Sequence, residues 1–404
     1  MKANFLVSHP TGNNFVRALV EELFKAEKLE NFFTTIGFGY DAITRRFLKN
    51  RRGYNIPDKL IKKQALREII RLTGFTSGSY SKKKIAVDKA YCSLDERVAK
   101  NLRKLNVKVL HTYEDCAYLS FKEAKNLGIH CSYELPIAHW ATGRRLLAEE
   151  AERHPDWELT LENKTEPEEK LLKKNEELEL ADSISCPSRF VLESIPSEIT
   201  HKTPCKVVPF GSPLISSIGR KDSPRLKNQK LKILFVGSMT QRKGLADIFD
   251  AMKLLKKEPV TLSVLGQPSM PLEFYRKKLS NFTYFSPRSN VDVQKVMLDH
   301  DALVLPSILE GRALVQQEAL ACGLPIIVTR NAGAEDLIEE GITGHIVPIR
   351  SPNKIAEAIT MLMTSKIEKN EVRKACQKKA EDYLWTVYAK NIVDFNMSRI
   401  AKEP

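Results

Sequence analysis

Residues 302–323 read ALVLPSILEGRALVQQEALACG, and this stretch decides the fold class. Its apolar start predicts a buried strand at Ala302–Leu305, and a helix is expected to begin near Ala313 after a short loop. A buried strand that runs through a loop into a helix is typical of parallel sheets with crossover helices.

The same alternation extends over the chain in both directions. Strands are expected at Asn4–Ser8, Phe32–Phe38, Val107–His111, His130–Tyr133, Ser183–Ser185 and Val207–Val208, and then at Lys232–Val236, Val260–Leu265, Ala302–Leu305, Pro325–Val328 and Gly344–Val347. Helices are expected between them, among them Ala334–Glu340 and Lys354–Thr364. The stretch 209–230 is rich in Ser, Pro, Gly and Lys and reads as a linker. We therefore expect an α/β protein with two parallel-sheet units, whose ligands bind at the carboxyl ends of the strands and in the cleft between the units.

Composition excludes several classes of protein. The chain has 404 residues, of which 42% are hydrophobic, so it is neither a disordered tail nor a collagen-like rod. Its seven cysteines are scattered and form no CxxC pair, which indicates a reducing compartment and argues against structural zinc. No stretch approaches the ~18 uncharged apolar residues of a spanning helix. The expected location is cytoplasmic, either soluble or peripheral at the cytoplasmic face of a membrane.

The net charge of +14 is unevenly distributed. Residues 1–110 hold 23 Lys and Arg against 10 Asp and Glu, which gives +13 and leaves +1 for the rest. Such a surface attracts nucleic acid, acidic lipid headgroups or a phosphorylated substrate, but it is also compatible with a solvated basic face. In 59–72, apolar residues recur three and four positions apart among basic ones. This pattern suits an interfacial helix, and it equally suits a helix packed on its own domain.

Two carboxylates, Glu310 and Glu318, lie eight positions apart. Glu310 is expected at the strand's carboxyl end, and Glu318 about a turn and a half into the helix. Backbone N–H groups at the start of that helix could bind an anion or sugar oxygens. The two carboxylates could hold hydroxyls on two different rings, but an N-terminal capping Glu with a surface Glu would read the same way.

Glu310 and Glu318 match the E-x7-E motif, and the chain resembles the retaining family-4 glycosyltransferases, which have the two-domain GT-B fold. Further stretches that resemble the family, in order, are Ala181–Ser183 with Pro187-Ser188, Val207–Gly211, Val236–Gly244 (VGSMTQRKG), Leu305–Ser307, Ala321–Pro325 and Gly341–Val347. Over the first 180 residues the resemblance rests mainly on architecture and on His9–Asn13.

The resemblance implies roles for individual residues. Glu310 would be the catalytic residue that contacts the transferred sugar, and Glu318 would hold the ribose of the donor. Lys243 and Arg242 would together neutralise the diphosphate. Gly12 would let the backbone of the other domain approach the diphosphate. Backbone amides near the helix start would orient the sugar, namely those of Gly311, Arg312, Ala313 and Leu314.

The resemblance also implies an activity and a domain plan. The chain would move a hexose-type sugar, with retention and without a metal or other cofactor, from a UDP-, GDP- or ADP-sugar to a glycan or lipid-linked acceptor in surface polysaccharide or lipopolysaccharide biosynthesis. Residues 1–210 would form an acceptor-side Rossmann-like domain, 211–230 a linker, and 231–377 the nucleotide-sugar domain. The helix in 378–404 would pack back on the first domain. The alternatives are other GT-B chemistry, such as a sugar phosphorylase or nucleotide-sugar epimerase, and a basic nucleic-acid-binding protein.

Three positions depart from the family pattern. Ser238 stands where an Arg is frequent, so Arg242 is the expected substitute. The family's E-G-F-G reads here Glu310-Gly311-Arg312-Ala313, and we expect the Arg312 side chain to point to solvent rather than to an anionic sugar. The first-domain histidine of many members has no clear counterpart. Candidates on the acceptor side, each of which could also be structural, are His111, Glu134 and His139.

The stretch Asp299-His300-Asp301 has the D-x-D spacing of metal-dependent glycosyltransferases. We reject that interpretation because the stretch precedes a strand, at the amino end of the sheet and away from the expected ligand site. Asp301 is expected to be a cap or turn residue.

Overall fold

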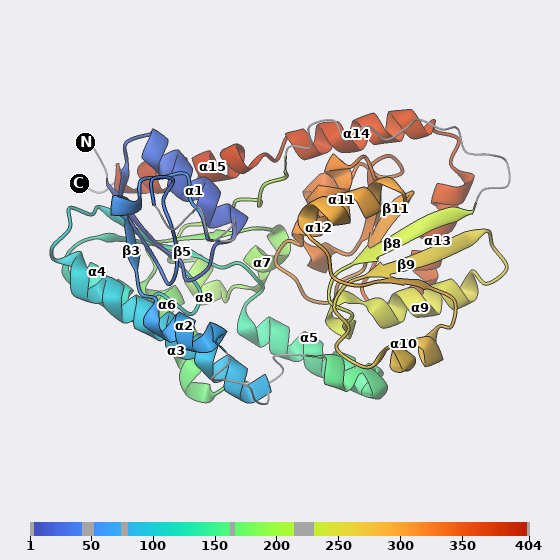
Figure 1. The fold of residues 1–404 in the computed structure, drawn as a ribbon, viewed down its shortest axis with the longest axis horizontal. Helices are drawn as coiled ribbons and strands as arrows, with labels where there is room; N and C mark the ends of the chain where they lie inside the picture. The colour runs from blue at the N-terminus through green and yellow to red at the C-terminus, as the bar shows by residue number, and fades with distance from the viewer. Residues whose placement is uncertain (1–3, 43–51, 74–79, 162–165, 214–229, 402–404) are drawn as a thin grey trace.

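A computed structural model describes residues 4–42, 52–73, 80–161, 166–213 and 230–401. Two parallel sheets, each flanked by helices, lie side by side along the long axis of the molecule (Figure 1). The two Rossmann-like units predicted from the sequence are thus confirmed. Most of the predicted linker, 214–229, and the basic stretch 43–51 lie outside the described residues.

The first sheet has seven strands in the order β3-β2-β1-β4-β5-β6-β7, and every pairing is parallel. Its strands are β1 (Phe5–Ser8), β2 (Leu29–Thr34), β3 (Ile61–Lys63), β4 (Val109–Tyr113), β5 (His130–Glu134), β6 (Ser183–Cys186) and β7 (Cys205–Val207). The central strands are buried along their whole length, as the runs FLVS and VLHTY predict.

Helices connect these strands and cover both faces of the sheet. They are α1 (Asn14–Lys25), η2 (Asp58–Leu60), α2 (Leu66–Leu72), α3 (Tyr80–Leu102), α4 (Tyr118–Asn126), α5 (Trp140–Arg153), η3 (Pro155–Thr160), α6 (Glu168–Leu180), α7 (Arg189–Ser194) and α8 (Ser197–Thr200).

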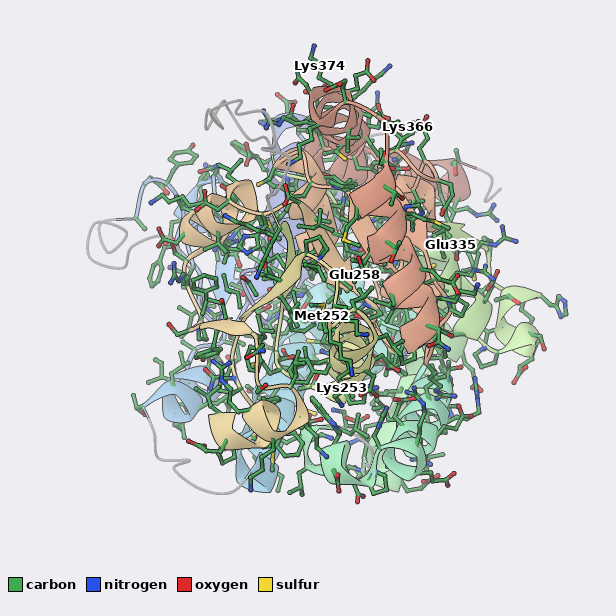
Figure 2. The ribbon with its side chains drawn as sticks, turned by 90° about the vertical axis from the view of Figure 1, so that its right-hand side faces the viewer. Met252, Lys253, Glu258, Glu335, Lys366 and Lys374 are labelled. Atoms are coloured by element: carbon green, nitrogen blue, oxygen red, sulfur yellow. The ribbon has the colours of Figure 1, made fainter. Side chains whose placement is uncertain are left out.

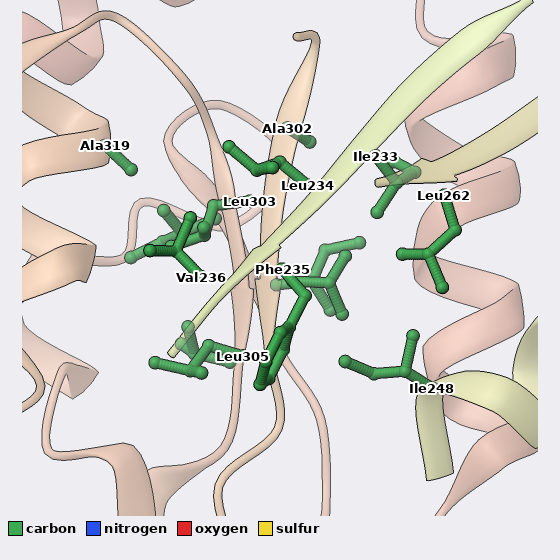
Figure 3. Close-up of a cluster of buried hydrophobic side chains, with 14 of the residues drawn as sticks. Ile233, Leu234, Phe235, Val236, Ile248, Leu262, Ala302, Leu303, Leu305 and Ala319 are labelled. Carbon is green, nitrogen blue, oxygen red and sulfur yellow. The ribbon is translucent and has the colours of Figure 1, made fainter. Parts of the chain in front are cut away.

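The second sheet has six parallel strands in the order β10-β9-β8-β11-β12-β13. They are β8 (Leu231–Val236), β9 (Val260–Leu265), β10 (Thr283–Phe285), β11 (Ala302–Leu305), β12 (Ile326–Val328) and β13 (Gly344–Ile346). Side chains of β8, β9 and β11 fill a continuous apolar core with α9 and α12, and Figure 3 shows Phe235, Leu305 and Ile248 within it.

The helices of this half are η4 (Gln241–Lys243), α9 (Leu245–Leu254), α10 (Leu272–Lys278), α11 (Asn290–Leu298), α12 (Leu314–Ala321), η5 (Arg330–Ala332), η6 (Glu335–Leu337), α13 (Pro352–Thr364), α14 (Lys369–Glu381) and α15 (Trp385–Ile400). The helix expected at Ala334–Glu340 is only a 3-10 turn, because the chain is already extended at Ile338 and pairs at Glu340 with Gly344. Figure 2 views this half from its outer side, with Lys374 of α14 at the top and Lys253 of α9 lower down.

The C-terminal stretch returns to the first domain. Tyr388 and Ile392 of α15 are buried in one cluster with Phe15 of α1. The single helix expected near 378–400 is broken, however, because residues 382–384 cross between the domains before α15 begins. There Leu384 pairs with Ser212, on the other segment that joins the domains.

Helix α5 and the turn η3 extend from the first domain along the second (Figure 1). Trp157 of η3 is part of the second domain's core, where its ring meets Phe249 edge-on. Glu150 is fully buried because it lies against the second domain.

Candidate functional site

Two cations and one carboxylate meet at the carboxyl ends of β8 and β11. Oε1 of Glu310 lies 2.5 Å from Nζ of Lys243 and 2.6 Å from Nη1 of Arg242. Arg242 also donates to the carbonyl of Leu309 at 3.0 Å. The structure therefore brings together three residues that the sequence analysis placed at one site.

Backbone geometry fixes these cations. Gly244, just after Lys243, has φ +74°, a left-handed conformation that suits glycine. A Cβ at Gly244 would lie 2.2 Å from the carbonyl oxygen of Pro306, so the loop after β8 packs directly on the loop after β11. The amide of Ile308 donates to the carbonyl of Arg242 at 2.9 Å and holds the two loops in register.

Lys243 is almost completely enclosed. Burial lowers the pKa of its ammonium group, and Arg242 acts in the same direction, while Glu310 opposes the shift. A lysine held in this way depends on a neighbouring anion for its charge. The phosphates of a ligand would supply that anion in place of Glu310.

Glu318 lies on α12, half-buried. Burial raises the pKa of its carboxyl group. Among the residues that the structure describes, this carboxylate has no hydrogen-bond or ion-pair partner. A half-buried carboxylate without a partner is suited to accept hydrogen bonds from ligand hydroxyls.

Gly311 is one of the points where the domains touch. A Cβ there would lie 1.7 Å from the carbonyl oxygen of Pro136, in the loop after β5. Ser188, after β6, donates its hydroxyl to the carbonyl of Gly311 at 2.6 Å. Two first-domain loops thus close on the residue expected to orient the donor sugar.

The expectation that Arg312 points to solvent is wrong. Its side chain is fully buried and pairs with Asp336, with Nη1 and Oδ1 2.7 Å apart. The neighbouring amide of Ala313 donates to the carbonyl of Ala332 at 3.3 Å. Neither the Arg312 guanidinium nor the Ala313 amide is free for a donor in this arrangement, because protein groups already occupy them.

Leu314 connects the start of α12 with the first domain. Leu314, the first residue of α12, packs against the first-domain cluster that contains Phe15. Phe15 follows Gly12 by three positions, on the helix that begins after the β1–α1 loop. The role of Gly12 at the diphosphate stays a prediction.

The loop with Gly12 also holds a buried histidine. The His9 ring meets the Tyr113 ring edge-on at 4.4 Å, and the Thr11 amide donates to its Nδ1 at 3.0 Å. Burial lowers the pKa of His9 to about 3, although a hydrogen bond with Thr11 acts in the opposite direction. His9 is therefore neutral in the folded protein at neutral pH.

This burial predicts acid sensitivity. Because the folded pKa lies below the unfolded value of about 6.5, the stabilisation from neutral His9 is complete above that pH and is lost as the pH falls toward 3. Relative to His9→Gln, the wild type should lose up to about 1.4 kcal/mol of unfolding free energy per pH unit in this window. Denaturant titrations of both proteins at pH 7, 6, 5 and 4 measure the difference, and a difference independent of pH would contradict the expectation.

The acceptor-side candidates are all buried. His111, on β4, lies with its Nδ1 2.9 Å from the Ser132 hydroxyl and its Nε2 3.5 Å from Oε2 of Glu134. Glu134, at the end of β5, accepts a hydrogen bond from the Tyr388 hydroxyl at 2.7 Å. Through Tyr388, this pair contacts α15 within the first domain, so the contact that the structure shows is one of packing between a strand and a helix.

His139 is the N-cap residue of α5, and its backbone amide donates to the Ser194 hydroxyl at 2.8 Å. Burial lowers the pKa of its ring. It follows Pro136 and Ile137, the two residues that a Cβ at Gly311 would meet.

A buried polar cluster between the domains was not predicted from the sequence. Gln241 donates to Glu150 at 2.7 Å and to Asp247 at 2.8 Å. Arg153 pairs with Asp247 at 2.6 Å, and Arg350 pairs with Glu150. Gln241 stands beside Arg242 and six positions before Asp247, which was the available signal, but the contacts between the domains join residues 91 to 200 positions apart and could not be predicted from the sequence.

Glu150, Asp247 and His154 have ligand atoms within 4.8 Å of one another, a spacing that could hold a metal ion. The two arginines and the Gln241 amide already satisfy both carboxylates. The charge of a cation would therefore be superfluous there. Asp301 of the D-x-D stretch lies at the amino end of β11, where its Oδ2 accepts from the Lys232 amide at 2.9 Å, as expected for a cap.

Comparison with known structures defines the fold. Sucrose-phosphate synthase of Thermosynechococcus elongatus covers 99% of both chains with a TM-score of 0.67 and 17% identity. The lipopolysaccharide outer core galactosyltransferase WaaB matches with a TM-score of 0.63 and 15% identity, over 99% of this chain and 100% of the other. Anabaena HepE in complex with UDP matches with a TM-score of 0.64 and 12% identity, over 98% and 100%. The chain has the GT-B fold of glycosyltransferases.

A family model matches the sequence of the second domain. Residues 220–383 match the family described as glycosyl transferases group 1, a match that is consistent with the resemblance seen in the E-x7-E region.

Among similar curated proteins, an uncharacterized glycosyltransferase of Methanocaldococcus jannaschii is 29% identical over 46% of this chain and 48% of its own. An "uncharacterized 41.2 kDa protein in cps region" of Klebsiella pneumoniae is 26% identical over 43% and 47%. The amylovoran biosynthesis glycosyltransferase AmsK of Erwinia amylovora is 23% identical over 38% and 41%. The matches span about half the length of these relatives or less.

Proposed function

We propose that the protein transfers a hexose-type sugar from a nucleoside-diphosphate sugar to a glycan or lipid-linked acceptor, with retention of configuration. The proposal places this step in surface polysaccharide or lipopolysaccharide biosynthesis. The cluster of Lys243, Arg242 and Glu310 at the carboxyl ends of β8 and β11 is the observation that carries it.

The chemistry fits this cluster. Departure of a nucleoside diphosphate develops negative charge on the phosphates and positive charge at the anomeric carbon. Lys243 and Arg242 would stabilise the phosphates without a metal, and Glu310 would lie beside the sugar. Glu318, whose carboxylate has no partner among the described residues, would accept hydrogen bonds from the ribose hydroxyls.

The relatives support the substrate class. HepE was determined with UDP and with UDP-glucose, WaaB is an outer core galactosyltransferase, and AmsK acts in amylovoran biosynthesis. We extend a nucleotide-sugar donor and a surface-glycan acceptor from these proteins to this chain.

A donor panel tests the proposal. The protein is incubated with UDP-, GDP- and ADP-sugars and EDTA, and release of nucleoside diphosphate is followed with and without a lipid-linked glycan fraction. Release from one donor, stimulated by acceptor, is expected. Sugar 1-phosphate formation with inorganic phosphate would indicate a phosphorylase, epimerised donor would indicate an epimerase, and salt-sensitive nucleic-acid binding without turnover would refute the transferase.

Helix α2 carries an exposed apolar surface, which we define as Leu66, Ile69, Ile70 and Leu72. These side chains are 68%, 47%, 39% and 56% exposed. The buried residue of this helix is acidic instead: Glu68 pairs with Arg52 at 2.6 Å and with Arg71 at 2.7 Å. The helix therefore exposes its apolar residues. The sequence pattern equally suited a helix whose apolar side packs on its own domain, and α2 is not packed in that way.

We propose that this α2 surface docks on an anionic lipid surface, near a lipid-linked acceptor. Exposed apolar residues beside Arg67 and Lys62, in a region of strong positive charge, fit the interface of an acidic bilayer. Among the described residues, no helix is both long and apolar enough to span a membrane, so the contact would be peripheral.

Vesicle sedimentation tests the surface. Recovery on vesicles with acidic lipids should exceed recovery on neutral ones and fall with salt. The double variant Leu66→Gln, Ile70→Gln should weaken binding at least about tenfold, because each apolar side chain contributes about 1.5 kcal/mol or more on burial. Leu172→Gln, at a leucine 55% exposed on α6, is the matched control. Equal recovery on both vesicle types, or equal loss in the control, would exclude lipid docking.

A further inference from the structure

Arg312 is the most heavily bonded side chain beside the candidate site. Its Nη1 donates to the carbonyl of Gly333 at 2.9 Å and to Asp336 at 2.7 Å, and Nη2 reaches the second oxygen of Asp336 at 3.1 Å. Its Nε lies 3.2 Å from Oε1 of Gln317. The guanidinium also lies 5.1 Å from the centre of the Tyr383 ring. This side chain therefore ties the 310–318 loop and helix to two other segments of the second domain.

The partners of Arg312 reach both segments that join the domains, which we define as the crossing segments 208–213 and 382–385. Gln317 donates to the carbonyl of Phe210 and, at 3.2 Å, to the hydroxyl of Ser212. The amide of Ser212 donates to the carbonyl of Tyr383 at 2.5 Å.

Tyr383, in the second crossing segment, also contacts a partner of Arg312. The Tyr383 hydroxyl donates to the carbonyl of Asp336 at 3.3 Å, next to the carboxylate that holds Arg312. A hydrogen-bonded path thus connects the loop with Glu310 and the helix with Glu318 to both crossing segments. Because these two segments join the domains, any rotation of one domain against the other must involve them.

We propose that Arg312 is a positioning residue that locks the 310–318 loop to the crossing segments, so that domain rotation and placement of Glu310 occur together. The proposal rests on the proposed transferase function. It assigns Arg312 no contact with the donor, since its donors are already used within the protein. Only a planar guanidinium can hold Asp336 in two-pronged fashion while also reaching Gly333 and Gln317, so lysine is not equivalent.

Turnover and hydrogen exchange together test the proposal. Arg312→Lys should lower kcat about 10- to 100-fold while the donor KM and the affinity for the nucleoside diphosphate stay within about threefold, because a small misplacement costs rate more than binding. Asp336→Asn should act in the same direction, and the double variant should be no worse than the more impaired single one. Amide exchange should rise in 311–318 and also in both crossing segments.

Arg276→Lys is the matched control. Arg276 donates to the carbonyls of Ser280 and Phe282 and lies over the Phe282 ring, but it does so within α10 and the loop after it. Faster exchange should stay near 276–285 in this variant, with kcat unchanged.

Exchange that rises around 312 and 336 but not in the crossing segments would overturn the proposal, as would a loss confined to KM. Should Arg312→Lys fail to fold, Asp336→Asn gives the same readouts. If the wild type turns over no donor, the transferase function fails, and the exchange pattern still decides the role of Arg312.

Discussion

Replacing Lys243 by alanine is expected to lower kcat/KM for the donor about 10³-fold, the largest effect of any single change. Lys243 is enclosed beside Glu310, and burial lowers the pKa of its ammonium group. The group therefore depends on a neighbouring anion to stay charged. A cation enclosed in this way stabilises a departing diphosphate far more than one in water would. The fold should survive, because Arg242 still neutralises Glu310.

Nucleotide affinities separate this role from general damage. Wild type should bind a nucleoside diphosphate more tightly than the corresponding monophosphate, and Lys243→Ala should lose most of that difference. Lys253→Ala is the matched control, since Lys253 lies on the outer face of α9 and pairs with Asp250 (Figure 2). An unchanged preference for the diphosphate, or turnover within tenfold of wild type, would remove Lys243 from the site.

Gly311→Ala is expected to reduce kcat about 100-fold or more with little change in nucleotide affinity. The added Cβ would lie 1.7 Å from the carbonyl oxygen of Pro136 and 3.0 Å from Cα of Ile137, both in the first domain. The domains would have to separate by more than an ångström, and displacement on that scale at a reacting centre costs rate steeply. Steady-state kinetics and nucleotide titration on the same preparation measure the two effects.

Gly341→Ala is the control for the glycine change. Gly341 has φ +79°, so alanine there is strained, but a Cβ would meet nothing within 4 Å. Gly341→Ala should lose some thermal stability and keep its turnover, whereas Gly311→Ala should keep its thermal stability and lose turnover. Comparable losses of turnover in both variants would show that the contact with Pro136 is unimportant.

Much of the sheet could be predicted because buried parallel strands are short apolar runs. Val260–Leu265 and Ala302–Leu305 have the expected bounds. The edge strand β10 has only three residues, one exposed and two half-buried, too few for a pattern. The break before α15 was also hidden, because it follows from pairing between Leu384 and Ser212, 172 positions apart, rather than from a local signal.

The candidate site, too, could be predicted only in part. Lys243, Arg242 and Glu310 were predicted together because each follows a strand of the same sheet, and carboxyl ends of parallel strands share an edge. The surroundings of Arg312 could not be predicted, since its burial depends on Asp336 and Tyr383, which local sequence does not place beside it. The contact between Gly311 and Pro136 depends on how two domains meet, which neither domain's pattern encodes.

The return of α15 to α1 has a consequence for protein engineering. The second domain is an insertion within the first domain, with entry near Ser212 and exit near Leu384, whose backbones are paired. An exchange of donor specificity between relatives should therefore move residues 213–383 as one cassette. A chimera joined at a single point after residue 230 would instead give α1 a foreign α15, and the cluster around Phe15 and Tyr388 would have to accommodate it.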